Sequence, residues 1–317
     1  MQRTLVVYNS RFGTTYEIAK KIGLILGPSK VIKYDEKNID INEYDFIVFG
    51  TPVYNGSIDE NIIKFILKNI NQLKVKKCAA FCCCIKDKDK EKYFKPLKEI
   101  LGESLIFFEG FTGRIKEEEL TVNDLNEIRL LFHQNNLKLE CFDNIKIDEI
   151  IDFALKLKHM KEDLLTNKIP EAKLKFYVEE FLNCHSTCTL STASNKRVRG
   201  TPIEYNYKNN YIYLLTEGGE KFCNLLKNCS VSVSVYDNFQ GMGKLAGMQI
   251  QGEAFLIDEK SREYKDVLNL RGINYENIIK LPITMNIIKI KLLKAEFIYS
   301  KFKSLGYDSK QIYYFTR

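Results

Sequence analysis

An apolar segment, a polar turn and an amphipathic segment follow one another at the start of the chain, and this succession constrains the fold most. Residues 5–8 are apolar, and residues 9–15 form a turn rich in hydroxyl groups. Apolar side chains then recur at helical spacing, at Ile18, Ala19, Ile22, Ile25 and Leu26. The pattern predicts a buried strand, a turn and a helix. The N-terminus of that helix offers backbone amides and a positive dipole end to an anion.

The composition of the turn indicates which anion it suits. A Walker loop requires a lysine before its last Ser or Thr, and residues 9–15 contain none. A dinucleotide fingerprint requires three spaced glycines, and only Gly13 is present. A hydroxyl-rich loop without lysine suits a phosphate monoester held by neutral donors. The alternative is a plain strand–turn–helix with a polar cap.

The turn resembles the FMN phosphate loop of flavodoxins. The resemblance is strongest to flavodoxin-like proteins related to the bacterial menaquinone-dependent protoporphyrinogen oxidase. It implies that the FMN phosphate is held by Ser10, Arg11, Phe12, Gly13, Thr14 and Thr15.

Length and composition bound the class of protein. The 317 residues suffice for two domains, and 45% hydrophobic residues support ordinary cores. No apolar run approaches the ~20 residues of a membrane span. We expect no membrane insertion. Nine cysteines without a secretory signal indicate reduced thiols in the cytoplasm.

The net charge of +7 is unevenly distributed. Residues 1–165 carry 26 basic and 26 acidic side chains, whereas residues 166–317 carry 22 and 15. The basic residues of the second half are scattered, without a Lys/Arg block. We therefore expect no nucleic-acid partner. A solvated basic surface with one phosphate-sized pocket explains the excess better.

Apolar segments alternate with helical patterns through residue 165. The apolar segments lie at 31–34, 45–50, 77–85 and 104–111, and the helical patterns at 58–70, 88–101 and 147–162. This alternation predicts an α/β doubly wound domain with a parallel sheet covered on both faces. With the flavodoxin strand order 2-1-3-4-5, the ligand lies at the carboxyl ends of strands 1, 3 and 4. Residues 116–140 carry no pattern that we can interpret.

Two loops follow the third and fourth predicted strands. By resemblance to flavodoxins, they flank the isoalloxazine ring, and Tyr54 stacks on it. The implied ring contacts are Thr51, Pro52, Val53, Tyr54, Asn55, Gly56, Cys83, Cys84 and Lys86. The chain has no Trp, which many flavodoxins use here, and the alternative is a turn with an exposed tyrosine. Adjacent strand residues point to opposite faces, so the run 82–84 of three cysteines predicts buried thiols rather than a metal site.

The pattern changes after a linker at 162–170. One helix is predicted at 174–183, followed by strands at 186–192, 201–207, 211–216, 230–236, 246–257 and 284–291. Short alternating strands with turn pairs, such as the turn at Asn209 and Asn210, predict a mostly antiparallel β barrel. The order of these features resembles the pyridoxamine 5'-phosphate oxidase-like split barrels, which bind FMN at a dimer interface. The resemblance implies a homodimer through this domain.

The same resemblance implies a second set of flavin contacts. Thr216 and Lys221 match the Thr and Lys that hold the phosphate in the family, and Gln249 reaches the ring. The full set is Arg197, Arg199, Thr201, Thr216, Lys221 and Gln249. A fixed ammonium and guanidinium groups hold a phosphate dianion well. The alternative is that these are solvated hairpin charges. Cys184, His185 and Cys188 lack a fourth metal ligand nearby, so we expect no metal.

The sequence thus predicts two FMN-binding domains, at 1–165 and 166–317. The expected function is that of a cytoplasmic FMN-dependent oxidoreductase or electron-transfer flavoprotein, with a small-molecule or protein redox partner. One alternative is a protoporphyrinogen-oxidase-like dehydrogenase. Another is a flavin-binding redox sensor without turnover. Electron exchange between the two flavins is a hypothesis motivated by the fusion.

Overall fold

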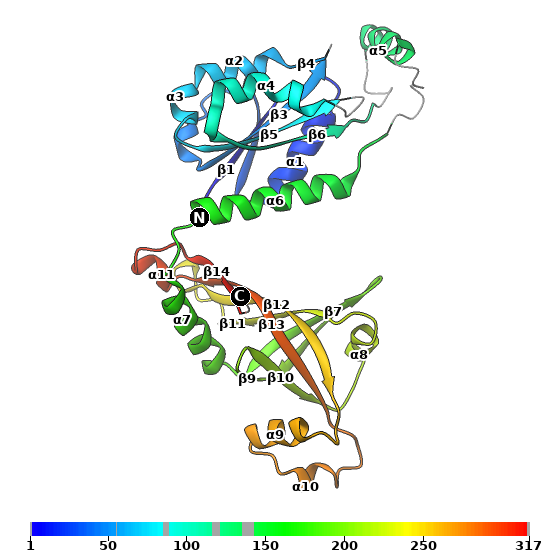
Figure 1. Ribbon diagram of the computed structural model, residues 1–317, viewed down its shortest axis with the longest axis vertical. Helices are drawn as coiled ribbons and strands as arrows, with labels where there is room; N and C mark the ends of the chain where they lie inside the picture. The colour runs from blue at the N-terminus through cyan, green and yellow to red at the C-terminus, as the bar shows by residue number, and fades with distance from the viewer. Residues whose placement is uncertain (1, 55, 85–88, 116–120, 135–142, 316–317) are drawn as a thin grey trace. The chain divides into compact units, whose positions relative to one another are not determined.

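The computed structural model describes residues 2–54, 56–84, 89–115, 121–134 and 143–315. The chain divides into two compact units, Met1–Thr166 and Asn167–Arg317. Each unit has its own sheet and its own hydrophobic core (Figure 1).

The first unit is built on a parallel sheet in the order β2-β1-β3-β5-β6. A two-residue strand, β4, pairs antiparallel with the end of β3 and lies off this path. Without β4, the order is the predicted 2-1-3-4-5, which is therefore confirmed. The strands are β1 (Thr4–Tyr8), β2 (Ser29–Lys33), β3 (Phe46–Tyr54), β4 (Ser57–Ile58), β5 (Lys77–Cys84) and β6 (Leu105–Thr112).

Helices cover both faces of this sheet because successive strand residues point to opposite sides. Leu5 and Val7 of β1 pack in one cluster, and Val6 packs in the other. The first cluster includes residues of α2 (Glu60–Lys68), α3 (Ile70–Leu73) and α4 (Lys90–Leu101). The second includes residues of α1 (Thr14–Leu26) and α6 (Ile147–Leu165). Short 3-10 turns η1 (Ile41–Glu43) and η2 (Gly102–Ser104) and helix α5 (Val122–Gln134) complete the described elements of this unit.

The three consecutive cysteines at the end of β5 are buried, as predicted. Cys82 belongs to the cluster under α2 and α4, and Cys83 belongs to the cluster under α1 and α6. Burial raises the pKa of the Cys83 thiol to about 12, although a hydrogen bond with Thr15 opposes the shift. These thiols therefore act as small apolar side chains rather than as ligands or nucleophiles.

Helix α6 is tied to the sheet through a buried lysine. Lys161 is 3% exposed, and its ammonium lies 3.1 Å from Thr4 Oγ1 and 2.5 Å from the Leu26 carbonyl. Because Leu26 ends α1 and Thr4 begins β1, this side chain connects three elements. A buried ammonium needs such acceptors, since an unpaired one costs several kcal/mol.

The second unit is an antiparallel sheet that curls into a half-open barrel around one core (Figure 1). The strand order is β8-β7-β11-β12-β13-β10-β9, with β14 paired to β13, and helix α7 (Glu171–Cys184) packs on the core. This confirms the predicted split barrel. The strands are β7 (Thr187–Ser194), β8 (Arg197–Glu204), β9 (Asn206–Lys208), β10 (Tyr211–Thr216), β11 (Ser230–Tyr236), β12 (Ala246–Ile257), β13 (Asn286–Tyr299) and β14 (Lys310–Tyr314).

Some strands differ from their predicted bounds. The strand expected at 201–207 begins earlier, at Arg197, because Asn195 in the left-handed region makes a tight hairpin with β7. It is also divided into β8 and β9 between Glu204 and Asn206. Strand β13 extends beyond residue 291 to Tyr299, where it pairs with the unpredicted β14. The predicted turn at Asn209 and Asn210 is confirmed, since both have positive φ.

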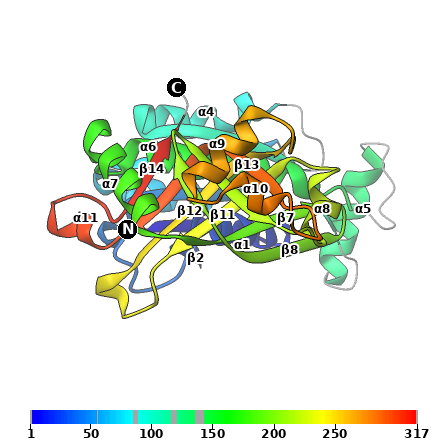
Figure 2. The same ribbon diagram turned by 90° about the horizontal axis from the view of Figure 1, so that it is seen from below.

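Short helices decorate the barrel. They are α8 (Lys221–Leu225), η4 (Met242–Lys244), α9 (Arg262–Leu270), α10 (Tyr275–Ile278) and α11 (Lys301–Ser304). Helices α9 and α10 lie side by side in both views (Figure 1, Figure 2). Tyr264 and Leu268 of α9 pack with Ile287 on the outer side of the barrel, so this pair covers part of the outer face.

Candidate functional site

The turn between β1 and α1 leaves the N-terminus of a 13-residue helix open to a ligand. Gly13 is the N-cap residue, with φ 82° and ψ −30°, and no side chain caps the helix. The first amides of an α-helix have no intrahelical acceptor and carry the positive end of the dipole. The turn lies at the carboxyl end of β1, beside β3, which is the switch point of the sheet. The geometry suits an anion such as a phosphate.

The two threonines of the turn already have partners. The Thr14 hydroxyl donates to the Arg114 carbonyl at 2.5 Å and accepts from the Arg114 amide at 3.2 Å. Thr15 is 2% exposed, and its side chain is hydrogen-bonded to the Cys83 thiol. The donors toward an anion are therefore mainly backbone amides and Ser10. Arg114 was not among the predicted site residues, since 100 positions separate it from Thr14.

Arg11 is the cation of the turn, and it is held by a carboxylate. Its Nη2 lies 2.5 Å from Oδ1 of Asp124 in α5, and its guanidinium carbon lies 5.1 Å from the Phe12 ring centroid. Hydrogen bonds from Thr121, together with Arg11, hold the pKa of Asp124 below its usual value. Because Asp124 stays ionised, the turn carries no net charge from Arg11.

An aromatic corner lies beside the turn. The rings of Phe12 and Tyr54 are 5.9 Å apart, edge to face, with an interplanar angle of 86°. Burial raises the pKa of Tyr54 to about 12, so its hydroxyl stays protonated at neutral pH. The structure therefore brings together the turn, Tyr54 and, through Thr15, Cys83.

The remaining predicted residues of the ring loops have mixed surroundings. Thr51 is fully buried, and its hydroxyl accepts from the Asp59 amide at 3.0 Å, which shapes the loop. Pro52 pairs with Cys83, and Val53 pairs with Ile58. Gly56 has φ 75° with open space around it, and the Cys84 thiol lies 3.5 Å from the Phe111 carbonyl. Asn55 and Lys86 lie outside the described residues.

In the second unit, one turn gathers most of the predicted phosphate ligands. The Lys221 ammonium donates to the Gly218 carbonyl, and the Thr216 hydroxyl lies 3.4 Å from the same oxygen. Arg199 forms an ion pair with Glu220 at the end of the turn. Lys221 is only 6% exposed, and this burial lowers its pKa. An ammonium that is partly removed from water and donates to a backbone carbonyl suits a bound dianion.

The predicted residues Thr201 and Arg197 lie on β8, as does Arg199. Thr201 and Arg199 share the side of the strand that Ile203 turns toward the barrel core. The Thr201 hydroxyl is buried and has no hydrogen-bond partner among the residues that the structure describes, a feature that a ligand oxygen would satisfy. Helix α8, which begins at Lys221, contacts both β7 and β8. Arg197 is exposed at the start of β8, beside the hairpin.

Gln249 lies on the opposite face of the sheet. Its neighbours Met248 and Ile250 point into the core, so its own side chain points outward. Within one chain, the structure does not bring Gln249 together with Thr201, Thr216 and Lys221. The alternation of residues 248–250 is the sequence signal that could have separated them.

Glu296, the β13 neighbour of Gln249, predicts a specific acid sensitivity. Burial alone would raise the pKa of Glu296, but ion pairs with Lys310 at 2.7 Å and Lys294 at 3.1 Å lower it to about 2. A lowered folded-state pKa adds stability above the unfolded value of about 4.3 that is lost as the pH falls toward 2. We expect Glu296→Gln to flatten the loss of stability between about pH 4.3 and 2 in urea titrations. Equal slopes for wild type and variant would contradict this.

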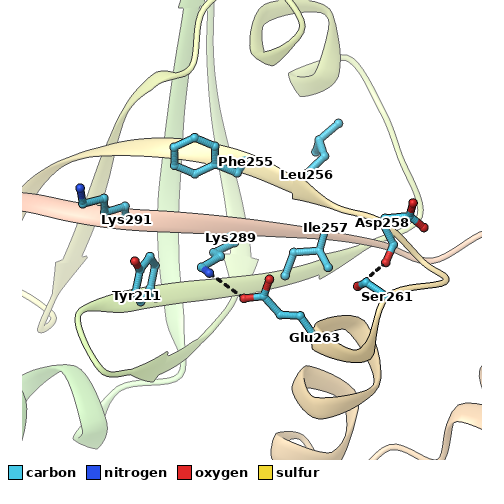
Figure 3. A pocket seen from close by; sticks show the side chains of 9 residues that line it. All are labelled: Tyr211, Phe255, Leu256, Ile257, Asp258, Ser261, Glu263, Lys289 and Lys291. Carbon is cyan, nitrogen blue, oxygen red and sulfur yellow. Dashed lines mark hydrogen bonds and ion pairs between the residues drawn. The ribbon is translucent and has the colours of Figure 1, made fainter.

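An open pocket of about 350 Å³ lies elsewhere on the outer face of the barrel, where β10, β12 and β13 meet α9 (Figure 3). Its central lysine, Lys289, is paired with Glu263 at 2.6 Å and lies 4.3 Å from the Tyr211 ring centroid. None of the predicted flavin contacts lines it. Its lining is Tyr211, Phe255, Leu256, Ile257, Asp258, Ser261, Glu263, Lys289 and Lys291.

Two of the three residues considered for a metal, His185 and Cys188, have other surroundings. His185 places Nδ1 2.8 Å from the Phe181 carbonyl and Nε2 2.8 Å from Asp237. Cys188 is buried, which raises its pKa to about 12. Among the described residues, no three His, Cys, Asp or Glu side chains gather as metal ligands. Within that same part of the chain, no helix has the length and apolarity that crossing a membrane requires.

The fold and these two sites define the class: a doubly wound unit with a phosphate-type loop, followed by a split barrel with a basic turn. The comparison with protein families agrees. Residues 5–138 match the family described as "Flavodoxin domain", and residues 175–298 match "Pyridoxamine 5'-phosphate oxidase". The chain is therefore a fusion of a flavodoxin-like domain and a pyridoxamine 5'-phosphate oxidase-like domain.

Several solved structures are similar to part of the chain. A FAD-binding protein from Mesorhizobium loti is 16% identical, over 38% of this chain and 89% of its own, with a TM-score of 0.31. General Stress Protein 26 from Bacillus anthracis is 16% identical, over 39% of this chain and 92% of its own, with a TM-score of 0.31. ChuZ from Campylobacter jejuni is 11% identical, over 49% and 66%, with a TM-score of 0.36. No curated protein matches the chain. The assignment therefore depends on the family matches.

Proposed function

We propose that the protein is an FMN-dependent oxidoreductase or electron-transfer flavoprotein with one FMN in each domain. The observation that carries the proposal is the uncapped N-terminus of α1, which opens at the switch point beside the aromatic corner of Phe12 and Tyr54. A phosphate at helix amides and a flat ring beside aromatic side chains are the two halves of a flavin site.

In the first domain, each group has a distinct task. The amides of Gly13 and the first turn of α1 hold the phosphate, with the Ser10 hydroxyl as a further donor. Tyr54 and Phe12 cover one side of the ring, and burial, which raises the pKa of Tyr54 to about 12, extends the pH range over which its phenol is neutral. The bound flavin supplies electron and hydride transfer, and the protein orients it.

In the second domain, Lys221, Thr216, Thr201 and Arg199 hold the second phosphate. Gln249 points away from these residues in its own chain. The proposal therefore includes a homodimer formed through the barrel, with the flavin between protomers and Gln249 of one copy beside the flavin that the other copy holds. Eight described cysteines are free thiols, which fits the reducing cytoplasm.

The test is the flavin content of the purified full-length protein. Flavin released by denaturation and quantified per chain is expected to approach two equivalents, one for each phosphate site. A value near one would assign flavin to a single domain. A colourless protein that takes up no added FMN would overturn the proposal. Oxidation of NAD(P)H or a quinol then separates an enzyme from a sensor without turnover.

A further inference from the structure

Helix α5 supplies a carboxylate to the phosphate turn of the first domain. Asp124 Oδ1 lies 2.5 Å from Arg11 Nη2, and the Asp124 side chain also accepts from the Thr121 hydroxyl at 2.6 Å and the Thr121 amide at 3.2 Å. The Thr121 hydroxyl in turn accepts from the Asp124 amide at 3.2 Å. These bonds fix the carboxylate at the start of the helix and aim it at Arg11.

The position of Arg11 makes this ion pair consequential. Arg11 lies two residues before Gly13, whose conformation opens the N-terminus of α1 to an anion. A guanidinium on such a turn would ordinarily add a strong, bidentate bond to a phosphate. Asp124 neutralises that guanidinium, so the pair adds no net positive charge toward a phosphate dianion.

The second arginine near the turn is held differently. Arg114 Nη2 lies 2.8 Å from both carboxylate oxygens of Glu17, and the Arg114 backbone forms both of the Thr14 bonds described above. Its side chain is also 3.5 Å from Asp143. Arg114 therefore stays in place when Asp143 loses its charge. The ion pair with Asp124, at 2.5 Å, is one of the contacts of Arg11.

We propose that Asp124 is a specificity-determining residue that withholds Arg11 from the phosphate and so limits how strongly the first site prefers a phosphorylated flavin. This rests on the proposed flavin function. The ligand and Asp124 compete for one guanidinium, so the charge of Asp124 lowers the affinity for FMN but not for riboflavin, which lacks the phosphate.

The test compares FMN with riboflavin on the full chain. Titrations by flavin fluorescence use a Lys221→Met background, which weakens the second site, and give dissociation constants for each flavin. Asp124→Asn is expected to lower the dissociation constant for FMN by up to about fivefold, which is the range of a solvent-accessible ion pair. The dissociation constant for riboflavin is expected to stay unchanged. Arg11→Gln removes the cation that pairs with Asp124, so the dissociation constant for FMN is expected to rise. In the double variant Arg11→Gln/Asp124→Asn, the tighter FMN binding expected of Asp124→Asn is lost.

The matched control is Asp143→Asn, which removes the same charge from the partner of an arginine that Glu17 still holds. It is expected to leave the ratio of the two affinities unchanged. The inference is wrong if Asp124→Asn changes the dissociation constants for FMN and riboflavin equally, or if it weakens the binding of FMN alone. Asp124 would then only position α5. If the wild-type sequence in this background binds neither flavin, the proposed function of the first domain fails as well.

Discussion

Full-length protein carrying Lys221→Met is expected to retain the flavin of the first domain and to lose that of the second, so its FMN content halves. Lys221 is 6% exposed, and its ammonium donates to the Gly218 carbonyl in the turn that also holds Thr216. Removing one partner of a buried, hydrogen-bonded charge pair weakens binding by at least about thirtyfold. Methionine keeps the length and apolar stem of the side chain, so the fold is retained.

The pH dependence of FMN binding provides a second readout of the same side chain. Burial lowers the pKa of Lys221 in the free protein, and a phosphate would raise it. Affinity at the second site therefore stays level below the free-state pKa and falls above it, at a lower pH than an ordinary lysine would give. The control is Lys227→Met, a change to an exposed lysine nearby. Unchanged flavin content in Lys221→Met would refute the assignment.

Gly252→Ala is expected to destabilise the barrel by about 2–3 kcal/mol through overpacking. A Cβ at this position would lie 2.7 Å from Ile290 Cγ2 and 2.7 Å from the Lys291 carbonyl oxygen. A side chain could yield, but the carbonyl belongs to β13, the partner strand of β12, and Ile290 is fully buried. The substitution therefore forces the two longest strands of the barrel apart beside their bulge.

Urea unfolding of the full-length protein checks this, with the two units expected to give separate transitions. In Gly252→Ala, only the barrel transition is expected to shift to a lower urea concentration. Gly243→Ala serves as the control, because a Cβ there meets nothing within 4 Å. A Gly252→Ala barrel as stable as wild type would show that β12 and β13 adjust more freely than their packing indicates.

Local patterns predicted the fold well. The alternation of apolar residues placed Cys82 and Cys83 in opposite cores. The apolar strands separated by helices predicted a parallel sheet covered on both faces, and the resemblance to flavodoxins supplied the correct strand order. Strand β14 was missed because its five residues depend on pairing with an extended β13. Its sequence alone carries too short a signal for a strand.

The site was less predictable because its contacts link distant segments. Thr14 and Arg114 are 100 residues apart, and no periodicity relates them. Asp124 lies in the segment whose role the sequence left open, yet it contacts Arg11 of the phosphate turn. Gln249 was grouped with Lys221 by family resemblance, whereas the alternation of β12 turns it to the other face. Long-range pairing therefore decides which of the predicted residues meet.

The buried ammonium of Lys161 limits where the chain can be divided. It bridges the beginning of the first strand to the last carbonyl of α1, although it belongs to α6, the last helix of the first unit. A fragment that stops short of this helix would expose the apolar face beneath it and leave Thr4 and Leu26 without their shared donor. Any dissection into autonomous flavin carriers must therefore cut beyond Leu165.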